Sequence, residues 1–433
     1  MQAHNGGVHV EQLRLGNGLT ALLAPMPGAP TASVWVWYRV GSKNEWPGMT
    51  GASHWVEHML FNGSPKYPKG AMDRAIMGVG GYLNAFTDVD FTAYLSTVPA
   101  SYVTLPLDIE ADRMSRATMN QSEVHRERKV VLSEREGAEN WPEFRAEEEL
   151  WALAYRRHPY RWDPLGYPED IRALDAPRLA EYYRRFYGPR NALLVVSGRF
   201  DRVAIARFIR SRFSRVPATG EDPTVREVEP VQTGARQTDM TGPGTTPFLA
   251  TGWAGPSVTE PTAAHAMLLD VLLGGETRLF STSSWGSRGD HPSSRLYRRL
   301  VATGLAVRAS SAFGPRVHPG LFTIHAQCAA GVPLGKLEAA LDRELERFAH
   351  DGPTRLELDE VREKIEQSTR LAYEGATRAA FRLGYFHTLA GAGLEDRLLR
   401  QVRRIRPEAV REAARAIFHP ARRVTVRYTP QGS

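Results

Sequence analysis

His54, Glu57 and His58 have the residue types and the spacing needed to bind a metal ion and to activate a water molecule. They lie in the stretch GASHWVEHMLFNG, which spans residues 51–63. Its apolar residues, uninterrupted by Pro or Gly, predict a helix. Residues four apart on a helix stand one above the other, so the two imidazoles can bind one ion. The carboxylate of Glu57 can then reach a water molecule held by the same ion.

The order H-x-x-E-H is the inverted zincin signature, in which two His ligands and one Glu base generate a nucleophile from water. So short a pattern also occurs by chance, and the alternative is a surface helix with two solvated or capping histidines. Residues elsewhere in the chain have to decide between these two interpretations.

A catalytic zinc site needs a third protein ligand and one open position for water. The candidates are acidic residues of a helix predicted over 122–151, with Ser122 as its N-cap: Glu123, Glu127, Glu134, Glu136 and Glu139. Glu127 and Glu134 lie two turns apart and share a face, whereas Glu136 points elsewhere. One of the pair can bind the metal while the other orients a histidine or the base, and spacing leaves open which does which.

Length and composition are those of a globular protein with more than one domain. The chain has 433 residues, 42% hydrophobic and 24% charged, and no apolar stretch long enough to span a membrane. Cys328 is the single cysteine, which excludes an internal disulfide and argues against a cysteine-based zinc site. The net charge is +7, but the Arg residues are scattered beside Glu and Asp. We therefore expect solvated helix faces and no nucleic-acid partner.

Apolar periodicity predicts an α+β fold. The predicted strands span 12–15, 19–24, 32–40, 191–198, 247–253, 306–313, 321–329 and 423–428, with two more inside 82–98. Besides the metal helix, the predicted helices span 72–79, 102–119, 122–151, 176–186, 202–213, 262–273, 334–351, 357–389 and 407–417.

The order of these elements repeats, which predicts two homologous domains, each a mostly antiparallel sheet with helices packed on one face. We expect a zinc-bearing catalytic domain over 1–215, a Pro-containing linker over 216–234 and a homologous non-metal domain over 235–433. Where the metal helix should recur, the second half reads HAMLLDVLLGG, with no second H-x-x-E-H. Only the first half can therefore carry the site.

Ordered motifs along most of the chain resemble the pitrilysin, or insulinase, family of zinc peptidases. The resemblance is strongest to short bacterial members akin to mitochondrial processing peptidase. The matching segments are Asn17-Gly18-Leu19, Val40-Gly41-Ser42 with Glu45, the inverted motif with HMLFNGS, GYLNAFTDVDFTAY, ERKVVLSE, His158-Pro159-Tyr160 and 187–198.

The resemblance implies His54, His58 and Glu134 as ligands of one Zn²⁺ per chain and Glu57 as the general base. It further implies that Glu127 supports the site without necessarily binding zinc. Asn84, Ala85 and Phe86 match the edge strand along which substrate peptides pair by β-addition.

The second half departs from the family pattern at two positions. Members that work alone carry an Arg and, seven residues later, a Tyr that hold the substrate carbonyl, and here Leu300 and Val307 take those places. Losing such an oxyanion donor costs about hundred- to thousandfold in rate. The chain therefore resembles the zinc-bearing subunit of a heterodimer whose other subunit carries the Arg–Tyr pair. Alternatively, Tyr297, Arg298 and Arg299, beside an apparent insertion over 276–292, replace the pair.

These observations predict a zinc metalloendopeptidase that hydrolyses peptides or unfolded polypeptide segments with a metal-activated water. The alternatives are a self-sufficient homodimeric processing peptidase and a non-catalytic core-type assembly subunit. The N-terminus, MQAHNGGVHVEQ, shows no signal peptide as written, although a trimmed mature chain would look the same. We expect a bacterial protein, with the periplasm favoured over the cytoplasm.

Overall fold

The structure, a computed structural model, describes residues 2–5, 8–274 and 292–431. The chain forms two compact units, and each unit combines segments from both halves of the sequence. Unit 1 comprises Met1–Glu136, Trp162–Glu227 and Arg370–Glu395, and unit 2 comprises Gly137–Arg161, Val228–Thr369 and Asp396–Ser433. Most of the predicted insertion, 276–291, lies outside the described residues.

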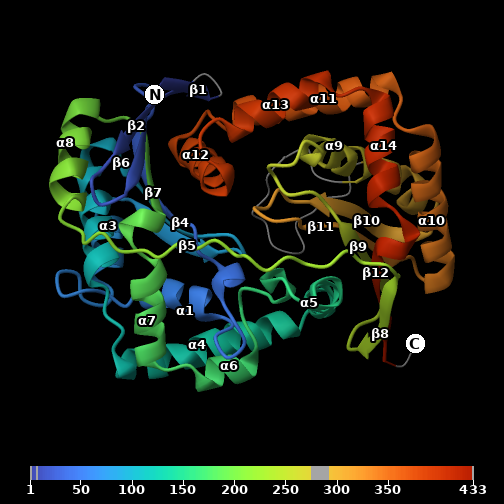
Figure 1. Cartoon of the computed structure of the whole chain (residues 1–433), viewed down its shortest axis with the longest axis horizontal. Coiled ribbons are helices and arrows are strands. Elements are labelled where there is room, and N and C mark those ends of the chain that lie inside the picture. Colours follow the sequence, from blue (N-terminus) through green and yellow to red (C-terminus); the bar gives the residue numbers. More distant parts are fainter. Residues whose placement is uncertain (1, 6–7, 275–291, 432–433) are drawn as a thin grey trace. The chain divides into compact units, whose positions relative to one another are not determined.

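Unit 1 is built on a seven-stranded sheet with the order β1-β2-β3-β7-β4-β6-β5 (Figure 1). All neighbours are antiparallel except β3 and β7. The strands are β1 Gln2–Asn5, β2 Val8–Arg14, β3 Thr20–Pro25, β4 Thr31–Tyr38, β5 Tyr82–Thr87, β6 Thr92–Pro99 and β7 Ala192–Gly198.

Strand β4 is apolar on both sides, so helices pack against both faces of this sheet. Val34, Val36 and Tyr38 join the core under the helices of the first half. Trp35 and Trp37 point to the other face and pack against Phe381 of a helix from the second half, α12 (Ala376–Ala390). The first-half helices are α1 Ala52–Met59, α2 Ala71–Gly78, α3 Thr104–Arg116, α4 Gln121–Glu139, α6 Pro168–Ala173, α7 Ala176–Phe186 and α8 Arg202–Phe213.

Unit 2 is built on a five-stranded sheet with the order β10-β11-β9-β12-β8, in which only β12 and β8 are parallel. A side chain at Gly252 would meet Leu150 of helix α5 (Pro142–Ala154), whereas its neighbour Trp253 packs on Phe418 at the end of α14 (Pro407–Ile417), so helices cover both faces here too. The strands are β8 Arg236–Gly242, β9 Phe248–Ala254, β10 Ala306–Phe313, β11 Leu321–Cys328 and β12 Arg423–Pro430. The helices are α5 Pro142–Ala154, α9 Ala263–Leu273, α10 Leu334–Asp351, α11 Arg355–Leu371, α13 Leu394–Arg404, which starts in unit 1, and α14 Pro407–Ile417.

All five strands of the unit 2 sheet have a counterpart in the unit 1 sheet, which adds β1 and β2 at one edge. The order β3-β7-β4-β6-β5 in unit 1 matches β8-β12-β9-β11-β10 in unit 2, and the single parallel pair falls at the same place. Strand β5 and strand β10 therefore occupy equivalent edges. The predicted pair of similar, mostly antiparallel α+β units is confirmed. The expectation that helices pack on one face of each sheet is wrong, because strands such as β4 are apolar on both sides and helices cover both faces.

Two of the predicted long helices are wrong, because each is broken. The helix predicted over 122–151 is α4 followed by α5, which starts at Pro142, a residue that cannot continue a helix from the preceding turn. Ser122 lies inside α4 and does not cap it. The helix predicted over 357–389 is α11 followed by α12, which begins after the extended Gly375. These breaks let α5 join unit 2 and α12 join unit 1. Strands β1 and β8 and helices α6 and α13 were not predicted.

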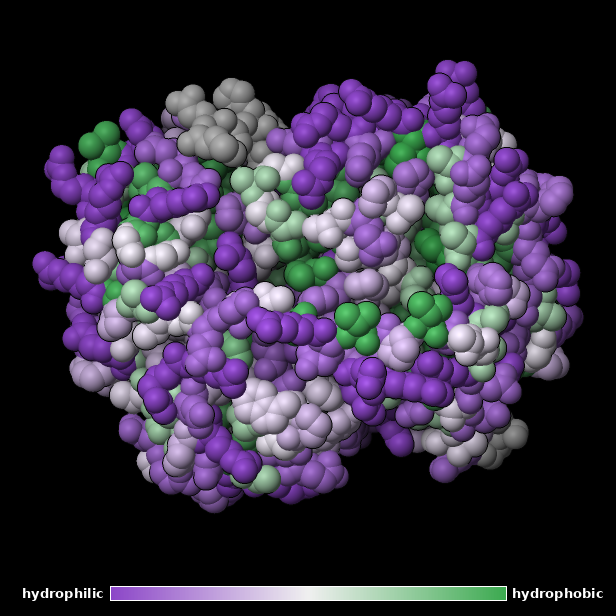
Figure 2. Space-filling view, viewed as in Figure 1, coloured by the Kyte–Doolittle hydropathy of each residue, from purple (hydrophilic) through white to green (hydrophobic). Residues whose placement is uncertain are grey.

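The surface visible in Figure 2 is dominated by hydrophilic side chains, with hydrophobic ones scattered among them. This is the pattern expected for Arg-rich helix faces exposed to solvent. No helix in the described ranges combines the length and the apolar character needed to cross a membrane.

Candidate metal centre

Helix α1 starts at a well-defined N-terminus that fixes the place of the histidines. Gly51, the N-cap, has a φ of 86°, which favours glycine, and an added Cβ would lie 3.0 Å from the carbonyl oxygen of Leu165. The carboxylate of Glu45 accepts hydrogen bonds from the backbone N–H groups of Gly51, at 2.8 Å, and Ser53, at 2.7 Å. Burial raises the pKa of Glu45 to about 8, against these hydrogen bonds, which lower it. Trp55 and Met59 anchor the helix in the core.

Three side chains direct donor atoms at one point. The Nε2 atoms of His54 and His58 are 3.1 Å apart, and Oε2 of Glu134 lies 3.5 Å from the first and 3.3 Å from the second. Donor atoms of the three residues all lie within 4.8 Å of one another. Two imidazole nitrogens and one carboxylate are the donor types that zinc prefers, so the residues present fit this metal.

Glu127 lies behind His58. Sequence spacing alone does not decide whether Glu127 or Glu134 takes this place, and the structure places Glu127 there. Its Oε1 is 2.9 Å from Nδ1 of His58, and its Oε2 accepts a hydrogen bond from the side-chain amide of Asn62 at 3.2 Å. This arrangement turns Nε2 of His58 toward Glu134. A carboxylate in this place fixes the tautomer of a ligating histidine.

The protonation of the two histidines differs. Burial lowers the pKa of His54 to about 3, and the neighbouring His58 lowers it further, so the imidazole of His54 is neutral near pH 7. Burial also opposes the charged form of His58. The hydrogen bond with Glu127 and the charges of Glu134 and Glu57 outweigh burial and raise its pKa. A metal ion must therefore compete with a proton mainly at His58.

Glu57 lies beside this donor set and is almost completely buried. Burial raises the pKa of its carboxyl to about 7, against the hydrogen bond from Thr87, which lowers it. The hydroxyl of Thr87 donates to Oε2 of Glu57 at 2.5 Å. A carboxyl group with a pKa near neutrality suits a role in proton transfer.

The segment Asn84, Ala85 and Phe86 lies on β5, the edge strand of the sheet, which pairs with β6 on one side. Helix α1 packs against this strand. Asn84 is exposed, whereas the ring of Phe86 packs edge-on against Trp35 and Trp37. The backbone of Phe86 therefore lies on the edge strand of the sheet, while its side chain holds the strand in place.

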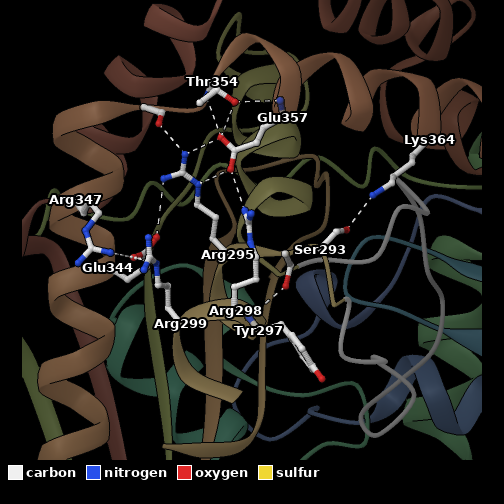
Figure 3. A network of polar contacts seen from close by, with 12 residues as sticks. Ser293, Arg295, Tyr297, Arg298, Arg299, Glu344, Arg347, Thr354, Glu357 and Lys364 are labelled. Carbon is white, nitrogen blue, oxygen red and sulfur yellow. Dashed lines mark hydrogen bonds and ion pairs between the residues drawn. The ribbon is translucent and has the colours of Figure 1, made fainter. Parts of the chain in front are cut away.

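The two positions that depart from the family pattern cannot donate a hydrogen bond from their side chains. Leu300 is fully buried, and Val307 on β10 is 52% exposed. The neighbouring arginines are engaged in ion pairs with helices of the same unit (Figure 3). Arg298 contacts Glu357 at 2.9 Å, and Arg299 contacts Glu344 at 3.4 Å.

Arg295 also pairs with Glu357, at 2.8 Å, and Arg347 with Glu344, at 3.0 Å. Burial opposes the charged form of Glu357, but its contacts with Arg295, Thr354 and Arg298 hold its pKa at about 2. This network engages Arg298 and Arg299, which argues against their replacing the missing pair.

Two sequence profiles of one family match the chain. Residues 20–166 match the insulinase family, peptidase family M16, and residues 173–365 match the peptidase M16 inactive domain. The paired α+β units and these matches define a class of metallopeptidases. The chain belongs to the insulinase family, peptidase family M16.

Several known proteins are similar to this chain. An uncharacterised zinc protease of Streptomyces coelicolor is 26% identical over 423 residues, covering 94% of this chain and 87% of the relative. The mitochondrial-processing peptidase subunit beta of Blastocladiella emersonii is 26% identical over 372 residues, covering 86% and 78%. The crystal structure of a protease from Helicobacter pylori superposes with a TM-score of 0.89 at 24% identity, covering 97% of this chain and 99% of the other. This structural likeness shows the fold.

Sequence reasoning assigned no role to Asn62 and Thr87, although both lie inside the quoted motifs. Asn62 lies in the turn after α1, where its backbone N–H donates to the carbonyl of Met59 at 3.0 Å, and its side chain reaches Glu127. Thr87 follows directly after Phe86, but its contact with Glu57 joins residues 30 positions apart. Nothing in the sequence pattern indicates the contact of Asn62 or that of Thr87.

Proposed function

We propose that this chain is a zinc endopeptidase that hydrolyses peptides or unfolded polypeptide segments, with one zinc ion per chain. The observation that carries the proposal is the convergence of His54, His58 and Glu134 beside the buried carboxyl of Glu57. Relatives named as zinc proteases support it.

His54, His58 and Glu134 would hold the zinc ion. When bound, zinc lowers the pKa of water and polarises a carbonyl group. Glu57 accepts the proton of the attacking water and returns it to the leaving nitrogen, which needs a group that changes protonation near neutral pH. Glu127 keeps Nε2 of His58 aimed at the metal position through its hydrogen bond to Nδ1.

The substrate peptide would pair with β5 along Asn84, Ala85 and Phe86. An edge strand presents free backbone groups, and backbone pairing binds many sequences. Because α1 packs against β5, a peptide on this edge runs past the proposed metal ligands. This geometry favours an endopeptidase acting on extended segments.

The second part of the proposal is a partner subunit that supplies an Arg–Tyr pair. Its support is that Leu300 and Val307 have no polar side-chain atom and that Arg298 and Arg299 are ion-paired elsewhere. A relative named as a subunit of mitochondrial-processing peptidase is consistent with assembly from different chains.

A self-sufficient homodimer and a non-catalytic assembly subunit are the competing proposals. The complete donor set with a neutral His54 favours catalysis over a purely structural subunit. A homodimer would need no other polypeptide for full activity. The need for a partner subunit therefore distinguishes the heterodimer from the homodimer.

The test is hydrolysis of a fluorogenic peptide by the zinc-loaded chain, alone and with a related subunit that carries the Arg–Tyr pair. Strong activation by that subunit supports the heterodimer, and full activity without it excludes the partner requirement. We expect Glu57→Gln to bind zinc normally and to lose at least about a hundredfold in kcat. Zinc binding without hydrolysis under any condition, including with the partner, would favour the assembly subunit.

A further inference from the structure

Thr87 is the last residue of β5 and makes a direct contact with the proposed base. Its hydroxyl donates to Oε2 of Glu57 at 2.5 Å. Within the described ranges, no other hydrogen bond to the carboxylate of Glu57 is found. This contact therefore holds one oxygen of the base and leaves Oε1 available to accept a proton.

The segment 41–45 fixes both ends of this hydrogen bond. Lys43 holds the turn after Thr87, because its backbone N–H donates to the carbonyl of Val89 at 3.0 Å. Its Nζ contacts the carbonyl oxygen of Asp90 at 2.6 Å and the carboxylate at 3.1 Å. Gly41 fits against the same turn, since a Cβ there would lie 2.1 Å from the carbonyl oxygen of Asp88.

The other end of the hydrogen bond is fixed through α1. Glu45, two residues after Lys43, caps the N-terminus of α1 through Gly51 and Ser53. The segment 41–45 thus holds the end of β5 and the start of α1 in one rigid frame. A hydrogen bond between two anchored elements is preorganised, so its geometry does not have to be formed during the reaction.

We propose that Thr87 is a positioning residue for Glu57 and that it links the edge strand to the base. Its hydroxyl fixes the rotation of the Glu57 carboxylate. Because Thr87 directly follows the segment 84–86, a peptide that pairs with β5 stiffens the strand that carries this hydroxyl. This inference rests on the proposed peptidase function and adds a residue and a coupling that the function does not require.

The test compares Thr87→Val, which keeps the shape of the side chain and removes the hydroxyl, with Thr87→Ser, which keeps the hydroxyl. Thr224→Val is the matched control, because the Thr224 hydroxyl also donates to a carboxylate, that of Asp222, at 2.6 Å on an exposed segment. Each variant is assayed for zinc content, melting temperature, kcat and KM. Crystal structures of the zinc-loaded forms report the orientation of the Glu57 carboxylate.

We expect Thr87→Val to lower kcat by about ten- to hundredfold, the range for loss of a charge-assisted hydrogen bond, with KM, zinc content and melting temperature nearly unchanged. Its crystal structure should show the carboxylate of Glu57 rotated. Thr87→Ser should retain the kcat and the carboxylate orientation of the wild type, and Thr224→Val should match the wild type.

An unrotated carboxylate in Thr87→Val overturns the positioning role, as does an unchanged kcat in an active enzyme. Loss of zinc or of folding in that variant, or an equal loss of kcat in Thr87→Ser, also overturns it. A rotated carboxylate in a chain that hydrolyses no peptide would uphold the positioning role and reject the proposed function instead.

Discussion

Helix α1 of unit 1 and helix α9 of unit 2 follow equivalent strands, β4 and β9, yet only α1 groups two histidines and a glutamate. The two helices even share a histidine, since Gly274 follows His265 by the same nine residues that separate Gly63 from His54. In this register, Leu268 and Leu269 take the places of Glu57 and His58, and both leucines are fully buried.

The difference lies in what surrounds each helix. Around α1, carboxylates and hydroxyls meet the polar side chains: Glu45 at the N-terminus, Glu127 behind His58 and Thr87 at Glu57. The N-terminus of α9 has no side-chain cap, and the helix is buried along most of its length. A helix in a core can therefore carry titratable residues only where neighbouring elements supply their partners.

The largest expected effect concerns the third proposed ligand. Glu134→Gln should weaken zinc binding by more than about a hundredfold, because it removes a charged donor that points at both histidines. Glu136→Gln is the matched control, since this exposed residue points to another face of α4. Metal analysis after dialysis against a chelator measures the difference. Equal zinc retention in the two variants would remove Glu134 from the site.

The equivalent substitution in unit 2 should destabilise the protein without creating a second site. Leu269→His places an imidazole among apolar residues, which costs about 2–5 kcal/mol when no partner is present. Leu269→Met, which conserves volume, should cost less than about 1.5 kcal/mol. Chemical denaturation measures both. A second zinc ion bound by Leu269→His would show that the partners around α1 are unnecessary.

A third effect is a loss of stability on acidification that originates in unit 1. Burial, together with the charges of Arg39 and Arg14, lowers the pKa of His387 on α12 to about 4 from 6.5. Between these pH values the unfolded chain binds a proton that the folded chain does not bind. Stability is therefore complete above pH 6.5 and falls toward pH 4, by about 3 kcal/mol.

Denaturation of His387→Gln over this pH range should show a shallower decline than the wild type. His350→Gln is the control, because the side chain of His350 is 84% exposed. An identical pH dependence in the wild type and His387→Gln would assign the decline to other groups.

The smallest expected effect tests the helix that unit 1 receives from the second half. Gly384 on α12 lies against Trp37, and an added Cβ would be 1.9 Å from Nε1 of the indole. Gly384→Ala should cost about 1–3 kcal/mol through overpacking. Gly137→Ala in α4, where nothing lies within 4 Å, should stabilise by about 0.5–1 kcal/mol. Calorimetry distinguishes the two, and a stabilising Gly384→Ala would mean that α12 packs loosely on the sheet.

The sequence alone determined the α+β class, the duplication and the phase of the proposed metal ligands. Helical spacing puts His54 and His58 on one face and groups Glu127 with Glu134, because these relations depend only on 3.6 residues per turn. Strand β10 and helices α7, α8, α10 and α14 were likewise predicted with their observed bounds or within a residue of them. The local pattern of apolar residues is sufficient to predict the bounds of an element wherever that element buries one continuous face.

Only the tertiary structure decided which glutamate faces the histidines, which residue holds Glu57 and which helix covers which sheet. Glu127 reaches His58 across 69 positions, and Thr87 reaches Glu57 across 30. The predicted single helices over 122–151 and 357–389 failed for a related reason. Each is divided between two units, so α5 and α12 are placed by packing on a sheet from the other half of the chain. Spacing within an element carries no information about such partners, because they are brought together only when the sheets and helices pack.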